Sequence, residues 1–103
     1  MNSIKIGGKN RPVNIGWDML KAFGKRTGRA FGEVFEVSNL TFEEVEALIY
    51  EALVWGAKEN GESFDADPGE VANWISKEMR SVVEFITFFG DEIQAQLGED
   101  EKN

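Results

Sequence analysis

The sequence of 103 residues contains no cysteine, no histidine and only two prolines. Without cysteine, the chain has no thiolate nucleophile, disulfide, redox pair or zinc knuckle. Without histidine, it has neither the usual general base beside a serine or cysteine nucleophile nor an imidazole metal ligand. Carboxylates, lysine, tyrosine, serine and threonine are the reactive side chains that remain. We therefore expect a protein that is not an enzyme and that carries no cofactor.

Long apolar runs are also missing. No run approaches the roughly 18–20 residues that span a bilayer, and the first residues lack the basic and apolar segments of a signal peptide. A hydrophobic fraction of 42% with 12% aromatic residues is nevertheless too apolar for a disordered chain. We expect a soluble, cytoplasmic protein with a single globular domain over residues 1–97 and a flexible acidic tail over residues 98–103.

The N-terminal part of the chain has few acidic residues, and the rest has few basic residues. Residues 1–31 hold seven Lys and Arg against one Asp, a net charge of +6, whereas residues 32–103 hold four against eighteen acidic residues, a net charge of −14. The basic end could attract nucleic acid or anionic membranes, but the larger acidic body repels both. We therefore expect neither as a partner. The two parts can attract each other within one fold or between copies, which leaves self-association open.

Local patterns predict an α+β fold that is mainly helical, with an N-terminal β-hairpin followed by about four helices. Apolar and polar residues alternate over 4–6 and 11–15 on either side of a turn-rich segment, 7–10. Pro12 lacks an amide donor, so the second strand should start there or lie at an edge. Residues 29–40 are expected to form a loop or an irregular single turn.

The first expected helix covers residues 17–27, with Trp17, Leu20 and Phe23 on one side and Gly28 at its end. A capping box formed by Thr41 and Glu44 predicts a long helix from 42 to about 60. Its predicted core side comprises Phe42, Val45, Leu48, Ile49, Ala52, Leu53, Trp55 and Gly56.

A second capping signal, Asp67 followed by Pro68 and Glu70, predicts another helix start. The apolar stripe changes phase near 77–80, which predicts a bend before a last helix over 79–97. The predicted core side of that last helix comprises Val82, Val83, Ile86, Phe89, Gly90, Ile93 and Leu97.

Acidic residues near the second cap resemble a metal site only superficially. Counted from Asp65, a calcium-binding loop would need Gly at the sixth position and Glu at the twelfth, where this chain has Glu70 and Ser76. Helix capping accounts for Asp67 and Glu70 without an ion. We expect no metal site.

Aromatic residues are dense, with three Trp, eight Phe and one Tyr. The apolar side chains that fall outside the predicted core sides are Tyr50, Val54, Phe85 and Phe88. Exposed aromatic residues that gather on a surface usually mark a contact with a partner. These side chains therefore form either a partner or self-association surface that includes Phe88, or part of the core through a different helix phase.

Several short strings occur in an order that matches a known family. They are Gly7-Gly8-Lys9, Trp17-Asp18-Met19-Leu20, Thr27-Gly28, Leu40-Thr41-Phe42-Glu43-Glu44, the 47–53 segment, Gly56-Ala57-Lys58, Phe64 and the 67–75 segment. In these strings the chain resembles the small tail assembly chaperones of long-tailed bacteriophages and prophages, over almost all of residues 3–90.

The resemblance implies a non-enzymatic role in the bacterial host cytoplasm. Such chaperones coat the long helical tape measure protein, keep it soluble until the tail tube forms around it, and are absent from the finished virion. A longer, frameshifted form recruits the tail tube protein in many phages. For this role we expect apolar contacts through Tyr50, Val54, Phe85 and Phe88, and charged contacts through Lys21, Lys25, Arg26 and Arg29.

Two other classes of function stay open. A small acidic inhibitor or immunity-type protein would bind through charge, and its binding would be lost in salt; its contacts would be Glu43, Glu46, Glu51 and Asp65. A carboxylate-dependent enzyme would need a cleft that holds paired acids with raised pKa values.

Overall fold

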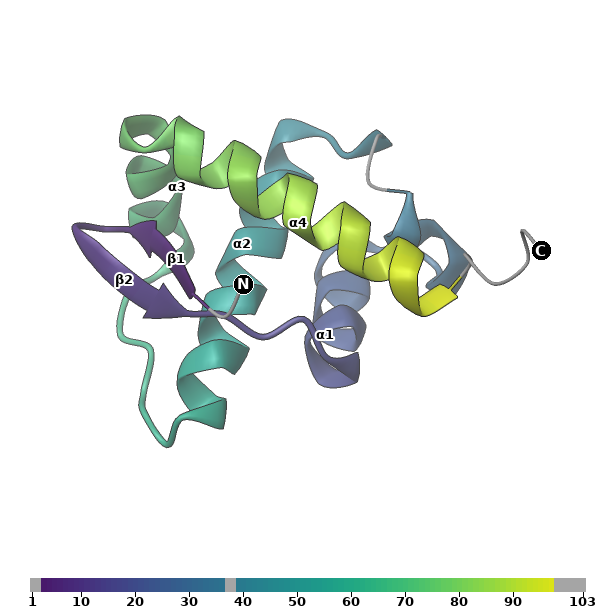
Figure 1. Ribbon diagram of the computed structural model, residues 1–103, viewed down its shortest axis with the longest axis horizontal. Helices are drawn as coiled ribbons and strands as arrows, with labels where there is room; N and C mark the ends of the chain where they lie inside the picture. The colour runs from purple at the N-terminus through teal and green to yellow at the C-terminus, as the bar shows by residue number, and fades with distance from the viewer. Residues whose placement is uncertain (1–2, 37–38, 98–103) are drawn as a thin grey trace.

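The chain begins with an antiparallel hairpin of β1 (Ser3–Ile6) and β2 (Lys9–Pro12) in the computed structural model, which describes residues 3–36 and 39–97 (Figure 1). Gly7 and Gly8 form its two-residue turn with φ angles of 64° and 85°, which other residues rarely adopt. The hairpin was predicted, but the predicted turn was too long. The second strand begins at Lys9 and ends at Pro12, and the chain then leaves the sheet. The expected tail, 98–103, lies outside the described residues.

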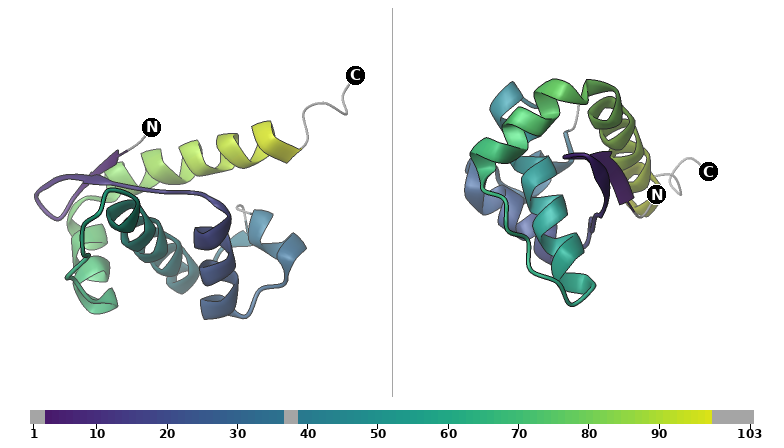
Figure 2. Two further views of the ribbon diagram at one scale, coloured as in Figure 1. Left: turned by 90° about the horizontal axis from the view of Figure 1, so that it is seen from below. Right: turned by 90° about the vertical axis from the view of Figure 1, so that its left-hand side faces the viewer.

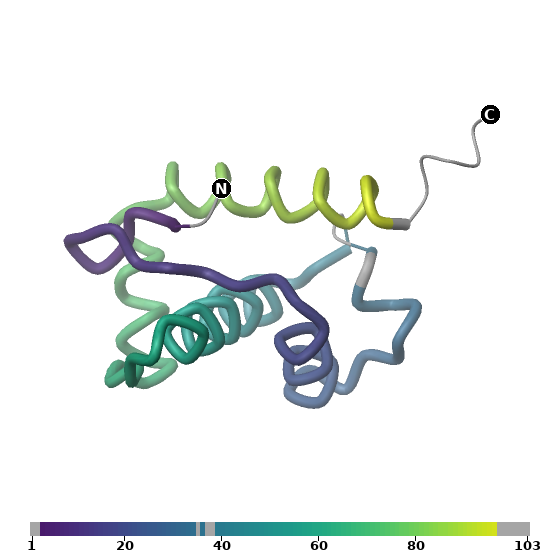
Figure 3. Tube along the Cα trace, turned by 60° about the horizontal axis from the view of Figure 1, so that its bottom comes forward, coloured from purple at the N-terminus to yellow at the C-terminus, as the bar shows by residue number. Residues whose placement is uncertain are grey.

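Four α-helices and one short 3₁₀ helix follow the hairpin. They are α1 (Trp17–Thr27), η1 (Phe31–Phe35), α2 (Phe42–Glu59), α3 (Pro68–Lys77) and α4 (Met79–Leu97). The prediction of a mainly helical α+β fold is confirmed. Figure 2 and Figure 3 show two layers, with α4 and the hairpin above α1, α2 and α3. None of the helices in the described ranges is both long and apolar enough to cross a bilayer.

Local capping chemistry sets the starts of α2 and α3. The hydroxyl of Thr41 accepts from the Glu44 amide at 3.1 Å, and the Glu44 carboxylate accepts from the Thr41 amide at 2.9 Å. Asp67 and Glu70 make the same reciprocal pair at the start of α3. Both predicted starts are therefore confirmed, as is the predicted bend, because regular helix is interrupted at Glu78 between α3 and α4.

The core lies between the two layers, and the predicted core side of α4 was partly wrong. Val82, Phe85, Phe89 and Ile93 are buried, whereas Val83 is 63% exposed. At 100° per residue, the buried set is centred about 120° away from Val83. Phe85 therefore belongs to the core, where its ring stacks on Phe89 with centroids 6.3 Å apart.

Two helix N-termini also differ from the prediction. On α1, Met19 and Phe23 are buried, while Trp17 is 62% exposed. On α2, the middle of the predicted core side is confirmed, but Phe42 at the first helical position is 87% exposed. A first-turn residue lies at the edge of the packed layer, so that helical periodicity alone does not bury it.

The connector from β2 to α1 crosses directly over α2. The amide of Asn14 donates to the Ala52 carbonyl at 3.1 Å. One turn further along α2, Gly56 lies against the backbone of Pro12 and Val13. This close approach sets the distance between the two layers and directs the chain into α1.

Candidate functional site

An open, largely apolar groove of about 520 Å³ lies between α1 and η1. Its lining comprises Trp17, Leu20, Lys21, Gly24, Lys25, Gly28, Arg29, Phe31 and Val34. We call it the α1 groove. Trp17 and Phe31 are 62% and 64% exposed, and their ring centroids lie 5.8 Å apart at a tilted angle of 50°. Two large exposed rings in contact with each other beside one hollow are a candidate contact surface for a partner.

Small residues on α1 allow η1 to come close. Gly24 and Gly28 are four residues apart, on the same side of the helix as Leu20. A Cβ at Gly24 would lie 3.2 Å from the Arg29 carbonyl oxygen and 3.4 Å from a methyl group of Val34, so even alanine would be tight there. Val34 is buried and holds η1 against the core. The groove is the space that the two glycines, which have no side chain, leave beside η1.

Arg29 fixes the far wall of the groove through four hydrogen bonds. Its guanidinium donates twice to the Glu44 carboxylate, with Nε–Oε2 at 3.0 Å and Nη2–Oε1 at 2.8 Å. It also donates to the carbonyls of Glu33 at 2.8 Å and Asn39 at 3.0 Å. Arg29 thus ties η1 to the start of α2. The expectation that it offers an exposed charge is wrong, because its side chain is mostly buried.

The pair with Arg29 makes the stability of the fold sensitive to acid. Hydrogen bonds from Arg29 and from the Thr41 amide hold the pKa of Glu44 at about 2, below its ordinary 4.5. Folding therefore favours the charged carboxylate, so the stabilisation is complete above about pH 5.5 and is lost as the pH falls from about 4.5 towards 2. We expect the free-energy difference between wild type and Glu44→Gln, measured by urea denaturation, to shrink over that window. A difference that stays constant down to pH 3, or an equal effect of the exposed control Glu43→Gln, would contradict this account.

The remaining predicted basic residues divide into two kinds. Lys21 and Lys25 are exposed, line the groove, and form no ion pair with any residue in the described part of the chain. Arg26 instead turns towards α2, where its Nε donates to the buried carboxylate of Glu51 at 2.7 Å. Its guanidinium also lies 4.8 Å from the ring centroid of Tyr50. The α1 groove therefore has two available cations, both lysines.

Comparison with known proteins gives no relative. No family model matches the chain, and neither the curated proteins nor the solved structures include a match.

The predicted apolar contacts are not all on the surface. Phe85 is fully buried, so its predicted place on a partner surface is wrong. Tyr50 is half-buried and packs edge-on against Phe64, with centroids 5.9 Å apart. Val54 and Phe88 are half-buried on different helices, α2 and α4. Among the described residues, two exposed aromatic rings that contact each other, Trp17 and Phe31, lie at the α1 groove.

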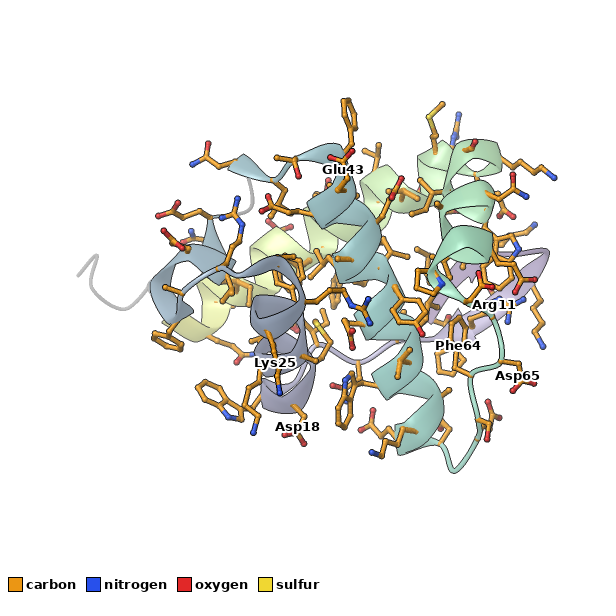
Figure 4. All side chains as sticks on the ribbon, turned by 180° about the vertical axis from the view of Figure 1, so that it is seen from behind. Arg11, Asp18, Lys25, Glu43, Phe64 and Asp65 are labelled. Atoms are coloured by element: carbon orange, nitrogen blue, oxygen red, sulfur yellow. The ribbon has the colours of Figure 1, made fainter. Side chains whose placement is uncertain are left out.

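The four acidic residues predicted for an inhibitor do not form one cluster, although Glu43 and Glu46 line one hollow near the start of α2. Figure 4 shows Glu43 at the start of α2 and Asp65 in the loop after α2, well apart. Glu46 is half-buried, and Glu51 is buried against Arg26. Over residues 3–36 and 39–97, no three acidic side chains come close enough to hold a metal ion.

The sequence prediction missed Trp17 and Phe31 as surface residues. Trp17 was placed on the buried side of its helix, and Phe31 fell in a segment without a predicted role. A signal was present in Gly24 and Gly28, which share a helix side with Leu20 and leave that side hollow. Sequence periodicity alone does not show which element lies opposite such a side.

Proposed function

We propose that this chain is a tail assembly chaperone of a long-tailed phage or prophage, and that it binds apolar helical segments of the tape measure protein in the α1 groove. The observation that carries the proposal is the exposed pair of Trp17 and Phe31 beside an apolar hollow. The resemblance of the sequence to such chaperones supplies the identity of the partner. No enzymatic step is part of this role.

The physical properties of the chain suit such a role. A helix that buries its apolar side in a groove gains roughly 25 cal/mol for each Å² of apolar surface removed from water, before ordering costs. Aromatic rings give a large contact area and lose few rotamers when they are buried. The net charge of −8 opposes aggregation of a complex that carries many copies.

Co-expression tests the proposal. The tape measure gene of the same phage or prophage should encode a very long helical protein, next to this chain's gene. Its product should be insoluble alone, and should be soluble and co-purify when this chain is present. The complex should persist in about 0.5 M salt because its main contacts are apolar. A tape measure protein that stays insoluble, or a complex that dissociates in salt as an acidic inhibitor would, contradicts the proposal.

Trp17→Ala should weaken this binding by about 2 kcal/mol, roughly 30-fold, because truncation of a central interface aromatic has this typical cost. The stability of the variant should fall by less than about 1 kcal/mol, since most of the ring is already exposed. Phe42→Ala is the matched control: Phe42 is also an exposed aromatic at the first position of a helix, but it lies outside the groove lining. Pull-down yield measures the change in binding, and urea denaturation measures the change in stability. Equal binding by Trp17→Ala and wild type, or lost binding in Phe42→Ala, would contradict the assignment of the groove.

A further inference from the structure

Trp17 separates the α1 groove from a second hollow on the same side of the molecule. The second hollow has a volume of about 400 Å³ and lies where the N-terminal turn of α1 meets the C-terminal turn of α2. Its lining comprises Asn14, Gly16, Trp17, Asp18, Trp55, Lys58 and Glu59. The indole of Trp17 lines both spaces and therefore forms a ridge between them.

The second hollow continues the aromatic character of the groove. Trp55 is half-buried at its wall, and the ammonium of Lys58 lies 4.5 Å from the Trp55 ring centroid. The side-chain amide of Asn14 donates to Glu59 at 2.7 Å, and the Asn14 side-chain oxygen accepts from the Gly16 amide at 2.6 Å. These bonds hold the approach to α1 in place beside the ridge. Phe31, Trp17 and Trp55 thus follow one another from the groove across the ridge into the second hollow.

The charge of the α1 groove differs from that of the chain as a whole. The described lining of the α1 groove contains no acidic residue, and its cations Lys21 and Lys25 are exposed and without ion pairs among the described residues. Figure 4 shows Lys25 and Asp18 on α1, on the side of the molecule away from Arg11 and Phe64. The groove is therefore a local basic surface on a chain with a net charge of −8. Such a surface attracts an acidic segment of a protein, while the acidic remainder opposes a long polyanion such as a nucleic acid.

We infer that the occupant is an amphipathic helix that lies across Trp17, with its apolar stripe in both hollows and glutamate or aspartate side chains against Lys21 and Lys25. Such a helix carries its apolar stripe and its charged side chains on neighbouring faces, which matches an apolar groove with two exposed lysines in its lining. This inference rests on the proposed function only in taking the α1 groove as the binding surface. It adds the second hollow and the charge of the partner.

Two synthetic helical peptides of about 20 residues test this inference. Both carry the same leucine stripe; one has glutamate beside the stripe and the other has lysine. Wild type should bind the glutamate peptide about fivefold more tightly, the gain expected from two exposed ion pairs. The double variant Lys21→Glu/Lys25→Glu should reverse this preference. Lys5→Glu/Lys9→Glu, which changes two exposed lysines on the hairpin, should keep it.

The three tryptophan indole N–H signals in a ¹H–¹⁵N NMR spectrum locate the peptide. The signals of Trp17 and Trp55 should both shift on addition of the glutamate peptide. The signal of Trp74 should not, because that ring packs between Arg11 and Phe64 at 4.2 and 6.2 Å. Trp→Phe variants assign the three signals.

The outcomes separate this inference from the proposed function. If the tape measure protein is still solubilised but the peptides bind equally, or Trp17 shifts without Trp55, the inference is wrong and the proposed function stands. If the peptides behave as expected but the tape measure protein stays insoluble, the inference stands and the proposed function is wrong. Indole shifts with protein concentration alone, or equal shifts with a single-stranded oligothymidylate, would assign the surface to a second copy or to nucleic acid and would overturn the inference.

Discussion

Gly56→Ala should destabilise the fold by about 3 kcal/mol or more, although alanine is the better helix former by about 1 kcal/mol. The added Cβ would overlap the Pro12 carbonyl oxygen and lie 2.6 Å from the Val13 Cα. Both obstacles are backbone, so no rotamer change relieves them. The connector would have to move off α2, and the hydrogen bond from Asn14 to Ala52 would be strained with it.

Gly90→Ala is the matched control for this prediction. Gly90 lies within α4, and a Cβ there would meet no atom within 4 Å. This substitution should therefore stabilise the fold by about 0.5–1 kcal/mol through helix propensity. Urea denaturation followed by circular dichroism gives both values. Changes of the same sign and similar size in the two variants would show that the connector does not lie on Gly56 as described.

Phe85→Ala should destabilise the fold by about 3–5 kcal/mol, the usual cost of removing a buried aromatic ring. Phe85 is fully buried, stacks on Phe89 and lies on the side of α4 that faces the core. A loss of this size is a large part of the 5–15 kcal/mol that typically stabilises a domain.

Phe88→Ala, three residues further along α4, should cost only about 1 kcal/mol because Phe88 is half-buried. The pair tests the phase of the helix directly. If Phe85→Ala kept its stability but lost binding to the partner, the original prediction of a partner surface at Phe85 would be correct and the core described above would be wrong.

The features that the sequence predicted well depend on neighbours in the chain. The Thr41–Glu44 and Asp67–Glu70 capping boxes join residues three apart, so the sequence pattern contains both partners. The end of α1 at Gly28, whose φ is 80°, is local in the same way.

The features that the sequence did not predict depend on residues far apart in the chain. The side of α4 that faces the core differs from the predicted side because it is set by the packing of β1 and α3 on this helix. The sequence of α4 alone does not show where those elements lie. Arg29 was expected on the surface, but its partner Glu44 lies fifteen residues away and brings it to the start of α2. The α1 groove depends on the approach of η1 to Gly24, and the second hollow on the crossing of α1 and α2.

Hydrogen–deuterium exchange on the full chain, alone and in complex with the tape measure protein, tests most directly whether the α1 groove binds the partner. Amide exchange reports the loss of local opening when a surface is covered. We expect slower exchange in α1 and η1 in the complex, and unchanged exchange in α3, which contributes no residue to the groove. Protection confined to α3 or α4, with α1 and η1 unchanged, would contradict the account.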